Sequence, residues 1–508
     1  MKRGLIPLLM IGALLSPPCY ATVTLPALFS DGMVLQQRSK VAMWGKGDPG
    51  ERISIATGWA VSVVTIADDD GKWQTVIETP AAGGPYEVTL TGRNRVVLKD
   101  VLVGEVWLCS GQSNMAFKLA RAENGKKEVA AADLPQIRFL TVSRQYGDEV
   151  YDDAPGSVWL KSSPQVAADF SAVAYFFAKR IYEELQIPVG IIHASWGGTP
   201  AEAWTPRRVL AGDPELAVYM TRWKEIEEQA GKDSVAYNEA MRKWKAARTT
   251  SGSPVVEKPK ESKALYYARR PWRKPSVLYN GMIHPLIPYT IKGVLWYQGE
   301  SNVGYPDEYY DLFAAMIKAW RNEWGTELPF YFVQITPFGY SDVDAAARLR
   351  EAQYNVSKTV PGTGMVATAD IGDMKDGHPI HKKEVGERLA RMALAKTYAR
   401  NGIVDKGPEV NSIQLRKGKV YIEFDQTICV AKGDRPQGFE LGFREQGTGA
   451  LRYVEATAER KRNTVVVSSE EGDRPVEIRY AWMLAGEGNI SNHAGLPAYP
   501  FRKAIPQR

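Results

Sequence analysis

Cysteine is scarce in this chain. The 508 residues contain three cysteines, and no two of them form a CxxC pair. Cys109 and Cys429, the two that lie beyond the first twenty residues, are far apart in the sequence. This usage argues against a disulfide framework and against a thiolate metal site.

Long apolar runs and basic stripes are also missing. After the first residues no stretch approaches 18 consecutive apolar residues, so we expect no membrane span. The formal charge of +6 is small for this length, and no run of Lys and Arg is interleaved with aromatics, which argues against a nucleic-acid partner. The 44% hydrophobic and 24% charged residues are typical of a soluble globular enzyme.

The N-terminus has the features of a secretory signal. Lys2 and Arg3 precede an apolar run from Leu5 to Leu15, and small residues follow near Ala21. This order of basic, apolar and small residues predicts a cleaved signal peptide over 1–21, and hence a secreted or periplasmic protein. Cleavage would remove both basic residues.

The length predicts several domains, because 508 residues exceed what one core supports. Residues 22–100 alternate apolar and polar positions over short runs separated by turn signals, the pattern of an N-terminal β-sandwich domain. Similar short alternating segments return over 401–508 and predict a C-terminal β region.

Residues 101–400 alternate buried-strand runs with helical periodicity, which predicts an α/β three-layer sandwich with a largely parallel sheet. A segment at about 205–285 breaks the alternation. It contains a charged helical stretch from about 214 to 248, then a Ser/Thr/Gly/Pro-rich joint at 249–254. We interpret it as an insertion that is placed over the site.

Ser113 is the first candidate catalytic residue. It lies in Gly-Gln-Ser-Asn-Met (111–115), directly after the apolar run 101–109. A polar loop after a buried strand lies at the carboxyl edge of a sheet, where open α/β folds bind ligands. Ser113 is therefore either a nucleophile or a serine that caps the next helix.

A serine nucleophile requires a base, and the chain offers five histidines. His193 lies in an apolar strand run, as a core histidine does. His284 and His493 have no acidic neighbour placed to orient them, and His381 is expected to face outward from a helix beginning at Pro379.

His378 differs from the others, because Asp373 and Asp376 precede it on the same loop. A carboxylate close by can hold the imidazole in one tautomer, which is the third role in a catalytic triad. His378 is thus the predicted base.

Two further loops supply candidate donors to an oxyanion. The loop 195–200 contains Gly197 and Gly198, whose backbone N–H groups can approach a substrate. The loop 296–302 offers the side-chain amides of Gln298 and Asn302.

Four blocks in this order make a more specific pattern: Gly-Gln-Ser-Asn-Met (111–115), Trp-Gly-Gly-Thr-Pro-Ala-Glu-Ala-Trp (196–204), Trp-Tyr-Gln-Gly-Glu-Ser-Asn (296–302) and Asp-Gly-His-Pro (376–379). They resemble the sialate O-acetylesterase family of SGNH hydrolases. The resemblance runs from about Leu25 to Tyr398, and it implies a flavodoxin-like SGNH fold.

The resemblance also implies roles for single residues. Ser113 is the implied nucleophile, His378 the base and Asp376 its orienter. An oxyanion hole is implied from the Ser113 N–H, the pair Gly197–Gly198 and the Gln298 amide. The spacing here is Asp-x-His, whereas general SGNH enzymes have Asp-x-x-His, so Asp373 stays open as the orienter.

The implied activity is removal of O-acetyl groups from carbohydrates, foremost O-acetylated sialic acids, without metal or organic cofactor. The aromatics that suit a sugar face are Trp196, Trp204, Trp296 and Tyr297. Arg348 and Arg350 are candidates to pair with a sialate carboxylate.

Three alternatives remain open. Acetylated xylan or pectin fragments carry the same acetyl group. A glycosidase using Glu202 and Glu300 is a second possibility, because both carboxylates lie in motif loops. A secreted carbohydrate-binding protein, which would act through the β regions, is the third.

Overall fold

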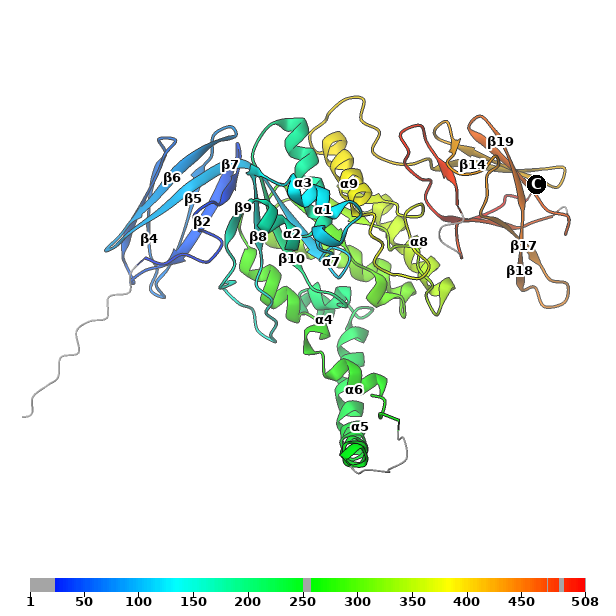
Figure 1. The fold of residues 1–508 in the computed structure, drawn as a ribbon, viewed down its shortest axis with the longest axis horizontal. Coiled ribbons are helices and arrows are strands. Elements are labelled where there is room, and N and C mark those ends of the chain that lie inside the picture. The colour runs from blue at the N-terminus through cyan, green and yellow to red at the C-terminus, as the bar shows by residue number, and fades with distance from the viewer. Residues whose placement is uncertain (1–22, 250–256, 473, 484–487, 508) are drawn as a thin grey trace, which may run out of the picture.

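The computed structural model describes residues 23–249, 257–472, 474–483 and 488–507. The predicted signal peptide lies outside these residues. In chain order, a β module, a central α/β unit and a second β module follow one another along the long axis of the molecule (Figure 1). None of the described helices combines the length and apolarity needed to cross a bilayer.

The first β module is built from two antiparallel sheets. One joins β2 (Lys40–Lys46) to β5 (Lys72–Glu78), and the other contains β3 (Arg52–Thr57), β4 (Ser62–Ile66), β6 (Gly83–Thr91) and β7 (Arg95–Gly111). Alternate side chains of both sheets, such as Val41 and Ile55, are fully buried in one shared core. This alternation accounts for the alternating apolar and polar residues in the sequence of the module.

β7 is the central strand of the molecule. Its first half pairs with β6, its middle pairs in parallel with β1 (Val34–Gln36), and its second half pairs with two strands of the α/β sheet. Asp100 adopts a positive φ of 57° where the pairing with β6 shifts register. The predicted boundary between residues 100 and 101 therefore falls inside a continuous strand.

The central sheet has the order β13-β12-β11-β7-β10-β8-β9. Its further strands are β8 (Leu134–Thr141), β9 (Trp159–Ser162), β10 (Val189–Ser195), β11 (Gly293–Tyr297), β12 (Phe330–Val333) and β13 (Thr363–Val366). The pairs from β13 to β8 are parallel, and β9 runs antiparallel at the edge. The sheet is thus mixed rather than wholly parallel.

Helices cover both faces of this sheet. α3 (Ala172–Leu185) and α9 (Lys382–Lys396) pack together on the face that receives Trp107 and Cys109. α7 (Tyr309–Trp324) and α8 (Val343–Thr359) cover the face that receives Val106 and Leu108. Successive β7 residues thus point to opposite cores, which makes three layers.

α9 begins later than the sequence suggested. Its first residue is Lys382 and its N-cap is His381, so Pro379 lies before the helix, not at its first position. The short helices elsewhere in the unit are α1 (Gly125–Ala130), α2 (Pro164–Asp169), η1 (Leu119–Arg121), η2 (Ala201–Trp204), η6 (Glu300–Asn302) and η7 (Pro306–Glu308).

The insertion is a helical arm. α4 (Arg207–Gly212) leads into α5 (Ala217–Thr249), which packs against α6 (Lys263–Ala268), and short turns η3 (Pro271–Arg273), η4 (Tyr279–Ile283) and η5 (His284–Leu286) lead back. α5 extends away from the body of the molecule (Figure 1). Part of the insertion nevertheless reaches the predicted site, because the Arg273 guanidinium donates to the Gly198 carbonyl. Most of the predicted joint lies outside the described residues.

The C-terminal β module has its own core of buried aliphatic and aromatic residues. Its sheets have the orders β14-β15-β20-β19, β18-β17-β21-β23 and β16-β22. The strands are β14 (Val410–Arg416), β15 (Lys419–Phe424), β16 (Cys429–Val430), β17 (Phe439–Arg444), β18 (Leu451–Glu455), β19 (Thr457–Lys461), β20 (Thr464–Ser468), β21 (Glu477–Tyr480), β22 (Ile490–Ser491) and β23 (Phe501–Ala504).

Candidate active site

Three strands of the central sheet end at one level. Ser195 of β10 and Tyr297 of β11 both pair in register with Gly111, the last residue of β7. Gly111 has a φ of 135°, and a Cβ built on it would lie 2.2 Å from the Tyr297 carbonyl oxygen. Only glycine fits this position, so the turn that presents Ser113 requires it.

The structure places Ser113 against His378. The loop between β13 and α9 brings His378 Nε2 to 2.8 Å from Ser113 Oγ, across 265 residues of sequence. Ser113 is partly exposed, and it caps no described helix, because η1 begins only at Leu119 with Lys118 as its N-cap. The arrangement is that of a hydroxyl with a base within hydrogen-bond reach.

Asp376, and not Asp373, lies beside the imidazole. Asp376 Oδ1 is 3.5 Å from His378 Nδ1 and also accepts a 2.8 Å hydrogen bond from the His378 backbone N–H. Asp373 Oδ1 accepts from the Lys375 N–H instead. Because 58% of the Asp376 side chain is exposed, solvent screens its electrostatic effect on the imidazole.

The other four histidines have separate partners. His193 is buried and its Nε2 lies 2.7 Å from Ser195 Oγ; burial foremost lowers the pKa of His193 to about 4. His284 contacts the Tyr151 carbonyl, His381 contacts Glu123 Oε2, and His493 contacts Cys429 Sγ. Only His378 contacts Ser113.

The loop that contains Gly197 and Gly198 lies beside the nucleophile. A Cβ built on Gly197 would lie 3.3 Å from Ser113 Cβ, so this loop passes directly beside the serine. Neither the Ser113 N–H nor the Gly198 N–H donates to an acceptor within the described part of the chain. Both remain available to an oxyanion.

Gln298 does not occupy the expected position of an oxyanion donor. Its side chain is fully buried, and Nε2 donates to the Thr199 carbonyl at 3.2 Å and to Asn302 Oδ1 at 2.7 Å. An amide has two N–H groups, so both are used. The buried Asn302 side chain donates to Glu202 Oε2 and accepts from the Ala201 N–H. The two amides tie the loops together.

A buried polar network lies behind Ser113. Asn114 Nδ2 donates to Glu300 Oε1 at 2.7 Å and to the Gly377 carbonyl at 3.0 Å, and Asn114 Oδ1 accepts from Lys382 Nζ at 2.6 Å. Asn114, which directly follows the nucleophile, is thus bonded to Gly377, which directly precedes the base. The network positions both loops.

Burial dominates the electrostatics of this network. It lowers the pKa of Lys382 to about 7, although the charges of Glu300 and Asp376 oppose the shift. Burial also raises the pKa of Glu300, against the hydrogen bond from Asn114. The sequence pattern did not single out Lys382, because a lysine in the first turn of a helix is ordinarily exposed.

The carboxylates of the glycosidase alternative are tied up in the structure. Glu202 is bonded to Asn302 and Glu300 to Asn114, and burial raises the pKa of both. Through these hydrogen bonds both carboxylates brace motif loops.

The predicted sugar-binding residues are mostly structural. Trp204, Trp296 and Tyr297 are fully buried core residues, and only Trp196 is partly exposed. Arg348 pairs with Asp307 and Asp344, and Arg350 is buried and donates to the Trp482 carbonyl. Neither arginine is available to a substrate.

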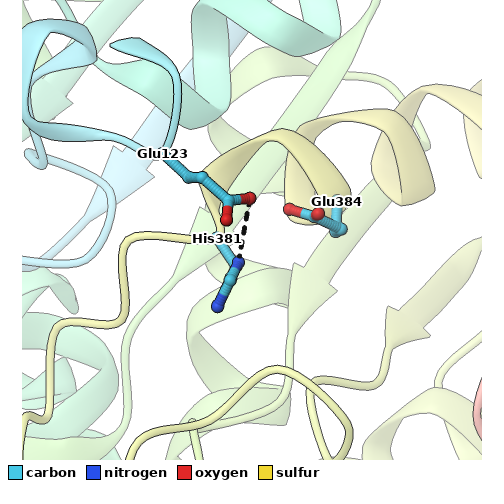
Figure 2. Close-up of side chains that lie close together, drawn as sticks. All are labelled: Glu123, His381 and Glu384. Carbon is cyan, nitrogen blue, oxygen red and sulfur yellow. Dashed lines mark hydrogen bonds and ion pairs between the residues drawn. The ribbon is translucent and has the colours of Figure 1, made fainter.

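One group of possible metal ligands lies at the start of α9. Ligand atoms of Glu123, His381 and Glu384 lie within 4.8 Å of one another (Figure 2), and His381 Nδ1 is 3.2 Å from Glu123 Oε2. A helix N-terminus favours carboxylates and disfavours cations. Glu384 lies in the first turn of α9, where a carboxylate is favoured, and Glu123 contacts His381.

Comparison with known proteins defines the class. Residues 267–400 match the family described as carbohydrate esterase, sialic acid-specific acetylesterase. The fold is similar to the crystal structure of a carbohydrate acetylesterase from Xanthomonas citri, with 32% identity and a TM-score of 0.79 over 95% of this chain and 99% of that one. The protein is a carbohydrate esterase.

Curated relatives narrow the assignment. The sialate O-acetylesterases of Pongo abelii and Homo sapiens are each 30% identical over 495 residues, which cover 89% of this chain and 86% of theirs. That of Mus musculus is 31% identical over 452 residues, 80% of each chain. The chain belongs to the sialate O-acetylesterase family of carbohydrate esterases, and the resemblance seen in the four sequence blocks is confirmed.

Proposed function

We propose that this carbohydrate esterase is a serine enzyme that removes acetyl groups from O-acetylated sialic acids through an acyl-enzyme. The contact of 2.8 Å between His378 Nε2 and Ser113 Oγ carries the mechanism. It joins a hydroxyl and an imidazole from loops that are remote in sequence, at the carboxyl edge of the sheet.

The reaction has two steps. His378 Nε2 takes the Ser113 proton as Oγ attacks the acetyl carbonyl, and the proton then passes to the sugar oxygen as the ester bond breaks. Water, deprotonated by the same nitrogen, attacks the acetyl-serine and releases acetate. The N–H groups of Ser113 and Gly198 stabilise the oxyanion, and Asp376 favours the charged imidazolium.

The sialate substrate rests on the relatives, whose names specify sialate O-acetylesterase activity at 30–31% identity. Xylan and pectin acetyl esters share the same reacting bond, so the second candidate is a plant-polysaccharide esterase. Acetate release from O-acetylated sialic acid and from acetylated xylan decides between them. Equal or faster release from xylan refutes the sialate assignment.

Ser113→Ala tests the chemistry. We expect it to abolish acetyl-ester hydrolysis while the fold, followed by circular dichroism, is unchanged. A serine-directed organophosphorus reagent should label wild type at Ser113 and inactivate it. Wild-type activity in Ser113→Ala rules out the acyl-enzyme. Inactivation with the label at Ser113 excludes both the glycosidase and the purely carbohydrate-binding alternatives.

We further propose that the mature enzyme is secreted or periplasmic, because the leading residues have the composition of a cleaved signal. The N-terminal sequence of protein recovered from its native compartment tests this. A mature chain that still begins at Met1 refutes it.

A further inference from the structure

A guanidinium stacked on aromatic rings lies in the loop that follows β8. The Arg144 guanidinium lies over the Trp196 ring, 5.3 Å from its centroid. Trp196 in turn stacks on Trp272, with centroids 5.5 Å apart and planes 12° apart, and Tyr146 makes edge contacts with both tryptophans. We refer to Arg144, Trp196 and Trp272 as the arginine stack.

Arg144 keeps its hydrogen-bonding capacity. Its side chain is exposed, and within the described ranges it forms no ion pair and no hydrogen bond. Stacking uses the face of a guanidinium and leaves the N–H groups at its edge free. The stack therefore holds the charged, planar guanidinium in place and leaves its N–H groups unoccupied. Two such parallel N–H groups can bind a carboxylate bidentately.

The arginine stack adjoins the nucleophile. Trp196 directly precedes Gly197, which lies beside Ser113, and the Trp196 N–H donates to the carbonyl of Gly111 at 3.1 Å. Trp272 directly precedes Arg273, whose guanidinium donates to the Gly198 carbonyl. Two of the three stacked residues are thus fixed to the loop that carries the Gly198 oxyanion donor.

Other cations near the stack already have partners. Arg273 is held by Gly198 and lies over the Tyr267 ring, and Lys274 pairs with Asp148 at 2.7 Å. Arg144, in contrast, has no such hydrogen-bond or ion-pair partner among the residues described.

We propose that Arg144 binds the carboxylate of an acidic sugar and so selects such sugars over neutral acetylated ones. The inference rests on the proposed function, since it assigns a specificity-determining residue to the same site. Its chemistry is a bidentate, charge-assisted hydrogen bond from the guanidinium edge to the sugar carboxylate, with the acetyl ester directed toward Ser113.

The test compares three substrates: O-acetylated N-acetylneuraminic acid, its methyl ester, which lacks the negative charge, and p-nitrophenyl acetate. The variants are Arg144→Gln and Arg144→Lys. Arg248→Gln is the matched control, because Arg248 lies over the Trp244 ring, 4.9 Å from its centroid, on the arm that extends away from the body (Figure 1).

We expect wild type to prefer the free acid over the methyl ester. Arg144→Gln should lower kcat/KM for the free acid by about 10–100-fold, the effect of losing a charge-assisted hydrogen bond, and leave the other two substrates unchanged. Arg144→Lys should recover part of the loss, because it keeps the charge without the fork. Arg248→Gln should match wild type on all three.

The outcomes separate the two proposals. If Arg144→Gln keeps the preference for the free acid, or wild type has none, the role of Arg144 is refuted while the esterase chemistry stands. If wild type hydrolyses p-nitrophenyl acetate but neither sialic ester, the sialate substrate itself is refuted. If wild type hydrolyses no acetyl ester, the proposed serine mechanism fails.

Discussion

Lys382 gives the sharpest test of how the site is held together. Its amine is fully buried and bonded to Asn114, and burial lowers its pKa from 10.5 to about 7. Below pH 7 the amine is charged in both the folded and the unfolded chain. Between pH 7 and 10.5 only the unfolded chain binds the proton, so raising the pH through this range favours the folded state.

The magnitude follows from the two pKa values. At about 1.4 kcal/mol per pH unit, the gap between 10.5 and about 7 corresponds to roughly 5 kcal/mol of unfolding free energy. Lys382→Met removes this dependence while it fills the same space. It also leaves Asn114 Oδ1 without its donor, a cost of about 1–3 kcal/mol that does not change with pH.

The assay is urea denaturation of wild type and Lys382→Met at several pH values from 6 to 9, followed by a signal from the α/β unit. Subtraction of the two cancels groups that titrate alike in both. We expect the unfolding free energy of wild type relative to the variant to rise by roughly 2–3 kcal/mol between pH 7 and 9. If the difference in unfolding free energy stays constant over this range, the lowered pKa of the buried Lys382 is refuted.

Four further substitutions probe the same loops. Asp376→Asn should lower kcat/KM by about 10–100-fold, which is less than the loss expected for a buried triad acid, because solvent screens the Asp376 charge. Asp373→Asn should leave kcat/KM unchanged. If steady-state kinetics of acetate release show that Asp373→Asn is the damaging change, the assignment of the orienting acid is reversed. Gln298→Leu should lower the unfolding free energy by about 1–3 kcal/mol, because the Thr199 carbonyl and Asn302 Oδ1 would lose their buried donor. If the variant instead has a wild-type denaturation curve and a large loss of kcat, Gln298 is an oxyanion donor. Gly111→Ala should destabilise the fold, since its Cβ would collide with Tyr297; a wild-type melting temperature contradicts this.

The meeting of Ser113 with His378 was predictable from the sequence. Both follow buried strand runs, and loops after parallel strands gather at one edge of the sheet. The scarcity of histidine then left few possible bases, and the nearby acids pointed to one of them. The structure adds which acid lies beside the ring, a choice between Asp373 and Asp376 that the loop sequence left open.

Other features depended on contacts between loops, which a local pattern does not contain. Gln298 lies in a motif loop, but its burial follows from how that loop bonds to the segment around Thr199. The apolar pattern does not predict β8, because Arg138 interrupts it. Arg138 is buried and forms an ion pair with Asp100 at 2.8 Å. With that strand unrecognised, its following loop and Arg144 could not be placed near the site.

β7 has a consequence for how the protein is made. Its first half finds its partner β6 as soon as the chain reaches Gly111, so the first module can close early in synthesis. Its second half, an apolar segment ending at the nucleophile loop, must wait for β10 and then β11, which are encoded far downstream. Until then the growing chain carries an unpaired hydrophobic strand edge, the feature that promotes aggregation and engages chaperones. The strand that presents the nucleophile therefore also exposes an apolar edge while the chain is being made.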